Sequence, residues 1–217
     1  MTTTTLDVQI DVCPNGDKEA LRLEYDVYLK EGYIEPNDEH IVLENRNYPN
    51  FVHFVARADG RVIGALRLVT DAEPRHGVFR LGSFRHFAIQ KWATDLLRSA
   101  DQRRIVELGT MVIDPKYRGG NTYAQLFQKA FEYAVLGRVH YALATIDEGF
   151  YHRLLKRGLP FREIGETRYY MGSYTVPAMI DVEQLMRMMF GPQTAGATAR
   201  PAQAAASSVP MRPALAS

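Results

Sequence analysis

The segment Val106–Gly120 constrains the fold of this chain more than any other. It begins as a short apolar run rich in β-branched residues and ends in a basic Arg-Gly-Gly turn. After the turn, apolar residues recur at three- and four-residue spacing as far as Val135, which predicts an amphipathic helix. A strand, a glycine turn and a helix N-terminus present several unpaired backbone N–H groups to one point, where a phosphate can bind. The same spacing also fits an ordinary strand–helix connection, so both interpretations stay open.

Composition excludes several classes of protein. A net charge of +1 argues against a nucleic-acid binder that depends on phosphate contacts. Cys13 is the one cysteine, which excludes an internal disulfide framework and a cysteine-rich metal site. The histidines show no ligand spacing, so no metal is expected. The N-terminus does not resemble a signal peptide and no apolar run reaches membrane-spanning length, so we expect a cytoplasmic protein.

Periodicity predicts alternating strands and helices over the first nine-tenths of the chain. Strands are expected at 6–12, 51–58, 61–69, 104–114, 141–146 and 162–174, and helices at 17–31, 87–98, 122–136, 149–156 and 182–190, with a polar loop at 36–50. Asp59-Gly60 favours a two-residue hairpin turn between the second and third strands. Mixed hairpins around a parallel strand–helix–strand unit predict one α/β domain over residues 1–191, with a mixed central sheet flanked by helices. Residues 192–217 are rich in Ala and Pro and are expected to form a disordered tail.

Glu107 is a carboxylate inside the apolar central strand. Burying it is costly unless it is paired or partly solvated. It either faces solvent, pairs with Arg67 or Arg103 as a structural partner, or acts as a general base with a raised pKa that takes the proton of an attacking amine. Gly109, in the same strand, either allows close packing or marks a β-bulge that turns a backbone N–H toward a developing oxyanion.

The segment Val112–Gly120 resembles the acyl-donor-binding turn of the GNAT acyltransferase superfamily, which carries a V-x-P-x-x-R-G pattern. The resemblance implies the GNAT fold. It also implies that the phosphopantetheine arm of a carrier-protein or coenzyme A thioester is held by Val112, Ile113, Arg118, Gly119 and Gly120. The family pattern continues with two small residues, where this chain has Asn121 and Tyr123. Their side chains leave less room for a pyrophosphate, which fits the single phosphodiester of a carrier protein better than coenzyme A.

A second superfamily signature is similar to Phe150–Phe161, and it implies that Tyr151 protonates the departing thiolate. By its position alone, one turn into a short helix, Tyr151 is more often a half-buried packing residue.

Three further segments, Leu21–Ile34, His53–Leu68 and Arg168–Ala178, resemble the carrier-protein-dependent N-acyltransferases. That group comprises FeeM-like long-chain N-acyl amino acid synthases, acyl-homoserine lactone synthases and ornithine lipid acyltransferases, and the last segment is similar to the first of these specifically. The resemblance implies that Arg22 and Arg67 line the substrate site. Acyl-homoserine lactone synthases carry E-x-x-R on the central strand, whereas here Glu107 is followed by Thr110 in the arginine position.

The resemblance as a whole implies an N-acyltransferase that joins a fatty acyl group from acyl-carrier protein to the amine of an amino acid. It implies no permanently bound cofactor, since the donor is a phosphopantetheine thioester, and acyl-CoA stays possible. The alternatives are an acetyl-CoA-dependent N-acetyltransferase, an acyl-homoserine lactone synthase and a catalytically silent acyl-binding module.

Overall fold

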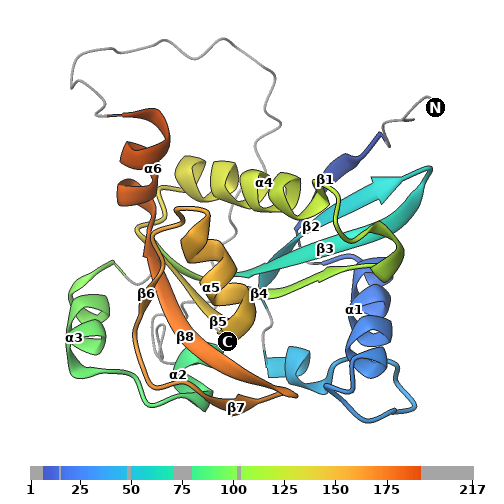
Figure 1. The fold of residues 1–217 in the computed structure, drawn as a ribbon, viewed down its shortest axis with the longest axis horizontal. Helices are drawn as coiled ribbons and strands as arrows, with labels where there is room; N and C mark the ends of the chain where they lie inside the picture. The colour runs from blue at the N-terminus through green and yellow to red at the C-terminus, as the bar shows by residue number, and fades with distance from the viewer. Residues whose placement is uncertain (1–6, 15, 48–49, 71–79, 102–103, 192–217) are drawn as a thin grey trace, which may run out of the picture.

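A computed structural model describes residues 7–14, 16–47, 50–70, 80–101 and 104–191, so the predicted tail lies outside the described residues. Its centre is an eight-stranded sheet in the order β1-β2-β3-β4-β5-β8-β6, with β7 also paired to β8 (Figure 1). The strands are β1 (Gln9–Pro14), β2 (Phe51–Ala58), β3 (Arg61–Val69), β4 (Ile105–Ile113), β5 (Tyr141–Asp147), β6 (Arg162–Glu163), β7 (Arg168–Tyr170) and β8 (Ser173–Asp181). The helices are α1 (Lys18–Lys30), α2 (Gly82–His86), α3 (Lys91–Ser99), α4 (Thr122–Leu136), α5 (Glu148–Lys156) and α6 (Val182–Phe190), with 3-10 turns η1 (Leu43–Asn47) and η4 (Pro115–Tyr117). β4 and β5 are parallel and every other named pair is antiparallel.

Helices cover both faces of the sheet (Figure 1). One face, here called the α4 face, carries α4, α5 and α6 over a large apolar cluster centred on Phe54, Leu66 and Leu126. The other face, here called the α1 face, carries α1 over Val55 and Ala65, and α2 and α3 over a separate cluster. The α1 face is thus packed at two places, and its middle lies between α1 and α2.

Aspartates fix where three helices begin. Asp17 accepts a hydrogen bond from the Ala20 N–H at 2.8 Å, Asp147 from the Phe150 N–H at 2.8 Å, and Asp181 from the Gln184 N–H at 2.9 Å. Each bond satisfies one N–H that the first turn of a helix leaves without a partner. No helix in the described ranges is long and apolar enough to span a membrane.

Most of the predicted elements are confirmed, with α4 and α6 at the expected residues and the hairpin turning at Asp59-Gly60. The single helix predicted over 87–98 is wrong. Residues 87–90 are extended between α2 and α3, because the Gln90 N–H donates to the Ile164 carbonyl at 2.7 Å and ties this stretch beside β6. The long strand predicted over 162–174 is also wrong, since Met171 and Gly172 have positive φ and turn the chain between β7 and β8.

The central strand β4 carries a bulge and then parts from β5. On the β3 side, Leu68 lies opposite Leu108 but Leu66 lies opposite Met111, so β4 has one extra residue at Gly109–Thr110. On the β5 side, pairing covers only Ile105–Leu108 with Tyr141–Ala144, although both strands run on beyond it. The sheet therefore opens between two neighbouring strands, directly after the bulge.

Candidate active site

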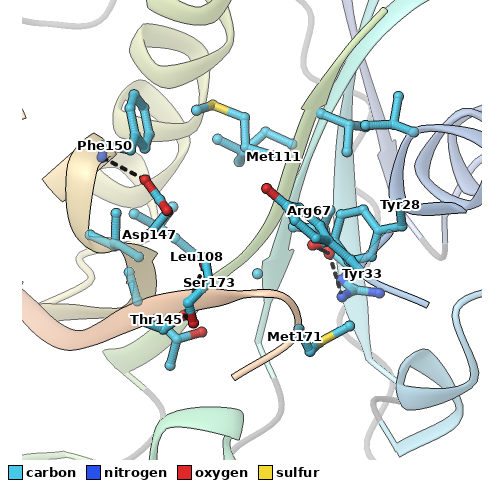
Figure 2. A pocket seen from close by; sticks show the side chains of 18 of the residues that line it. Tyr28, Tyr33, Arg67, Leu108, Met111, Thr145, Asp147, Phe150, Met171 and Ser173 are labelled. Carbon is cyan, nitrogen blue, oxygen red and sulfur yellow. Dashed lines mark hydrogen bonds between the residues drawn. The ribbon is translucent and has the colours of Figure 1, made fainter. Parts of the chain in front are cut away.

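A cavity of about 630 Å³ occupies the opening between β4 and β5. Residues on both faces of the sheet line it. Elements α1, β3 and β4 form one side of the opening, and β5, α5 and β8 form the other side (Figure 2). In that view Tyr28 and Arg67 lie opposite Asp147, Phe150 and Ser173. Its volume falls in the range of pockets that bind small molecules and cofactors.

A buried polar network forms the wall of the cavity on the α1 face. Arg67 of β3 and Glu24 of α1 are both nearly inaccessible to solvent, with 3.6 Å between the guanidinium and the carboxylate. Thr110 joins them, because its hydroxyl donates to Glu24 and accepts from Arg67 Nη2 at 3.0 Å. The Tyr28 hydroxyl donates to the same Thr110 oxygen at 3.4 Å, and burial raises the pKa of Tyr28. The network places a positive charge at the cavity wall with a paired negative charge behind it.

Glu107 lies next along β4 and is held by the N-terminus of α2. Its Oε1 accepts from the Ser83 N–H at 2.8 Å and the Ser83 hydroxyl at 2.5 Å, and its Oε2 accepts from the Gly82 N–H at 2.7 Å. Burial raises the pKa of Glu107, while these hydrogen bonds and the charge of Arg67 act in the opposite direction. The side chain is buried and lines the cavity, so the solvent-facing interpretation of Glu107 is wrong.

Gly109 sits at the bulge, against Arg67. A Cβ added there would lie 3.0 Å from Arg67 Nε and 3.4 Å from the Arg67 carbonyl oxygen. The missing side chain therefore makes room for the guanidinium to lie across β4. The expected bulge is confirmed, and close packing against Arg67 occurs at the same residue.

The wall on the α4 face is apolar. It comprises Leu66, Leu108, Met111 and Ile113 of the sheet, Phe127 of α4, Phe150 and Leu154 of α5, and Phe161. All of these side chains except Ile113 also pack with the largest apolar cluster among the described residues. One cavity therefore joins a buried charged wall to a hydrocarbon wall through the opening in the sheet.

The predicted phosphate turn forms the mouth of the cavity, where Arg118, Gly119 and Gly120 lie directly before α4. Gly119 has a φ of 86°, a conformation that glycine adopts without strain. The N-cap residue Asn121 makes no side-chain capping bond, so the first N–H groups of α4 are not satisfied by a local cap. Arg118 Nη1 donates to Glu31 at 2.8 Å, which directs its guanidinium toward α1.

Tyr123 narrows the same mouth. The Arg157 guanidinium lies 4.7 Å from the centre of its ring and hydrogen bonds its hydroxyl. Arg153, one turn earlier on α5, lines the cavity as well. The mouth therefore carries arginines beside the carboxylates Glu31 and Asp147, and it is narrowed by an aromatic ring.

The structure brings eight of the ten predicted site residues to the cavity wall. They are Arg67, Glu107, Gly109, Val112, Ile113, Arg118, Gly119 and Gly120. Tyr151 is not among the lining residues, because it packs in the apolar cluster and hydrogen bonds Glu163, and its role stays a prediction. Arg22 is exposed and pairs with Asp26 at 3.1 Å, away from the cavity.

Sequence reasoning missed Glu24, Tyr28, Ser83 and Tyr170. Burial raises the pKa of Tyr170 to about 12, and its ring stacks on His86 at the cavity wall. Glu24 had a usable signal, because helical spacing puts this carboxylate between Ala20 and Val27 on the buried face of α1. A carboxylate at such a position requires a buried partner of opposite charge, and the sequence offers Arg67, which lies inside an apolar strand.

The fold matches acyltransferases of known structure. The synthase FeeM from uncultured soil microbes is 16% identical, with a TM-score of 0.56 over 82% of this chain and 93% of that one. The acyl-homoserine lactone synthase LasI is 13% identical, with a TM-score of 0.64 over 86% of this chain and 96% of LasI. A protein from Lactobacillus plantarum assigned as an N-acetyltransferase is 15% identical, with a TM-score of 0.55 over 81% of this chain and 98% of that one. At these identities the likeness establishes the fold, which is that of GNAT acyltransferases.

Sequence comparison identifies the family. No curated protein matches the chain in sequence. The family model described as N-acyl amino acid synthase FeeM, however, matches residues 19–181, which span every strand and helix that lines the cavity. The chain therefore belongs to the FeeM family of N-acyl amino acid synthases and is an N-acyltransferase with the GNAT fold.

Proposed function

We propose that this protein transfers a long-chain fatty acyl group from acyl-carrier protein to the amine of an amino acid. One observation carries the proposal: the cavity crosses the sheet and has a hydrocarbon wall on one face and a buried charged wall on the other. An acyl chain and a zwitterionic acceptor require these two environments, side by side.

The donor arm is assigned to the opening between β4 and β5. Beyond Leu108, β4 is no longer paired with β5, so Gly109–Ile113 offer backbone N–H and C=O groups along the cavity. Pantetheine contains two amide groups and can add to such an edge much as an extended peptide does. Its phosphate would then reach the N-terminus of α4 at Gly119 and Gly120, where backbone N–H groups and the helix dipole favour an anion.

Carrier protein is favoured over coenzyme A by the mouth of the cavity. The Tyr123 ring, with Arg157 against it, occupies space beside the phosphate turn that a second phosphate would need. Carrier proteins are acidic, and Lys116, Arg153 and Arg157 would attract one electrostatically, although Glu31 and Asp147 also line the cavity.

Glu107 is the proposed general base. A neutral amine nitrogen attacks the thioester carbonyl carbon, the new C–N bond forms, the C–S bond breaks, and one proton must pass from nitrogen to sulfur. Glu107 would accept this proton and return it to the thiolate, since it lines the cavity and its pKa is raised by burial. At the Gly109 bulge the regular pairing of β4 with β3 is interrupted, and backbone N–H groups there would bind the developing oxyanion. Arg67 would bind the acceptor carboxylate.

The test is a donor comparison with purified protein and the common amino acids, read by mass spectrometry. We expect N-acyl amino acid from palmitoyl-carrier protein, with a higher kcat/KM than from palmitoyl-CoA and no comparable turnover of acetyl-CoA. Equal turnover of palmitoyl-CoA would overturn the choice of carrier protein. Preference for acetyl-CoA would overturn the long-chain assignment.

A further inference from the structure

A second, small cavity of about 20 Å³ lies beneath α4 on the α4 face. Among the residues that line it are Val106 of β4, Ala142 of β5, Ala130 and Ala134 of α4, and Leu185 of α6. All of the lining residues have hydrocarbon side chains. The cavity is therefore part of the space between helix α4 and the sheet.

This small cavity shares two lining residues with the large one, Leu108 and Phe127. Leu108 belongs to the last β4 position paired with β5, so the sheet fixes it in place. Phe127 projects from α4, is half-buried, and packs edge-on against Phe161 with 6.5 Å between ring centres. The Phe127 ring is thus the part of the partition between the two cavities that α4 supplies.

The chemistry of the small cavity selects what can enter it. A buried water requires two to four polar partners, and the side chains here provide none. Protein interiors are otherwise close-packed, so an apolar void beside a substrate cavity is unusual. Hydrocarbon is the ligand that gains from entering, at roughly a fourfold gain in binding for each buried methylene.

We infer that Phe127 is the residue that limits the length of the acyl chain, by closing the end of the chain's path toward Ala130 and Ala134. The inference rests on the proposed function, because it takes the large cavity as the acyl site. Shortening Phe127 would join the two cavities and extend the path along α4.

The experiment measures kcat/KM for a series of acyl-carrier proteins that differ by two carbons. In Phe127→Ala we expect the optimum to move to longer chains, with each added methylene favoured by roughly fourfold relative to wild type. Phe127→Leu should give a smaller shift and covers the case in which the alanine variant folds poorly. Phe127→Ala combined with Ala130→Leu refills the extension from the other side and should return the optimum toward the wild-type length.

Phe150→Ala is the matched control, since Phe150 lines the large cavity but not the small one. It removes the same aromatic group without opening the partition. An equal shift in Phe150→Ala, or an unchanged optimum in Phe127→Ala and Phe127→Leu, would overturn the inference.

A second readout separates this inference from the proposed function. Free fatty acids of increasing length are added to wild type and to Phe127→Ala, and Tm is measured. Longer chains should raise Tm in the variant beyond the length at which they cease to do so in wild type. That result would support the inference even if wild type made no N-acyl amino acid, whereas an identical length limit in both proteins would overturn it.

Discussion

Ser83→Ala tests whether Glu107 acts as a base or only as a structural anchor. The Ser83 hydroxyl donates to Glu107 Oε1 at 2.5 Å, and its removal leaves the two backbone hydrogen bonds to the carboxylate in place. A hydrogen bond to a charged group is worth roughly 1.5–3 kcal/mol, and one pH unit corresponds to about 1.36 kcal/mol. The lost bond stabilised the ionised form, so the pKa of Glu107 must rise in the variant. If the ionised carboxylate is the active form, the acid limb of the kcat profile moves to higher pH by up to about 1–2 units.

The assay is kcat measured between pH 5 and 9 with saturating substrates, with Tm recorded at each pH. Glu107→Gln is the companion variant, and it should lower kcat by roughly 100-fold or more and abolish the acid limb. Its amide nitrogen would face a donor of Gly82 or Ser83, so some loss of stability is expected as well. A Ser83→Ala profile with an unmoved acid limb and a lowered Tm would show that Glu107 anchors α2 and takes no proton.

Two further variants test the packing at the site. Gly109→Ala places a Cβ 3.0 Å from Arg67 Nε and should lower kcat/KM about 10–100-fold by displacing the guanidinium. A kcat/KM equal to that of wild type would contradict this role of Gly109. In Gly120→Ala the nearest contact of the added Cβ is 3.7 Å, so Tm should stay unchanged. His53 is buried beside Arg67, and burial is the main reason that its pKa is lowered to about 4. The folded state therefore favours the neutral imidazole, and the free energy of unfolding falls by roughly 3 kcal/mol as pH falls from about 6.5 to about 4. Urea unfolding at pH 7 and pH 4.5 should show His53→Asn, whose side-chain oxygen can accept the Asp17 N–H as His53 Nδ1 does, losing part of that pH dependence.

Local signals in the sequence were enough to predict most of the fold. The hairpin turn depends on Asp59 and Gly60 themselves, and the main helices follow their own apolar periodicity, so neighbouring residues are enough to locate these elements. One error lies where a distant contact decides, and the other lies at the Met171-Gly172 turn, whose positive φ values end the strand predicted over 162–174. Residues 87–90 stay extended because they hydrogen bond near β6, and no local pattern indicates that.

The site was predictable where a motif fixes backbone position, as at Gly119 and Gly120. The sequence could not predict which side chains of a helix point into the cavity and which point into the core. On α5 both Phe150 and Tyr151 follow the capping residue Asp147, yet the helix turns Phe150 to the cavity and Tyr151 into the core. Both faces of this helix carry apolar residues, so its periodicity does not distinguish them.

The bulge explains how one strand supplies groups to both walls of the site. Before it, odd-numbered residues such as Ile105 and Glu107 face α1's side of the sheet. After it, the even-numbered Thr110 and Val112 face that side, because the extra residue shifts the alternation by one. Without the extra residue, Thr110 would point to the α4 face, and neither Glu24 nor Arg67 would have its hydroxyl as a partner.

The same shift sets the direction of the proposed reaction. If a thioester lies in the opening between β4 and β5, its acyl chain would extend toward one face of the sheet and its nucleophile would approach from the other. The hydrocarbon wall is on the α4 face, and the charged groups Arg67 and Glu107 are on the α1 face. An amine bound beside Arg67 would therefore meet the carbonyl carbon from the side on which Glu107 can take its proton. If Gly109→Ala closes this passage, it should reduce turnover more than it weakens binding of the acyl donor.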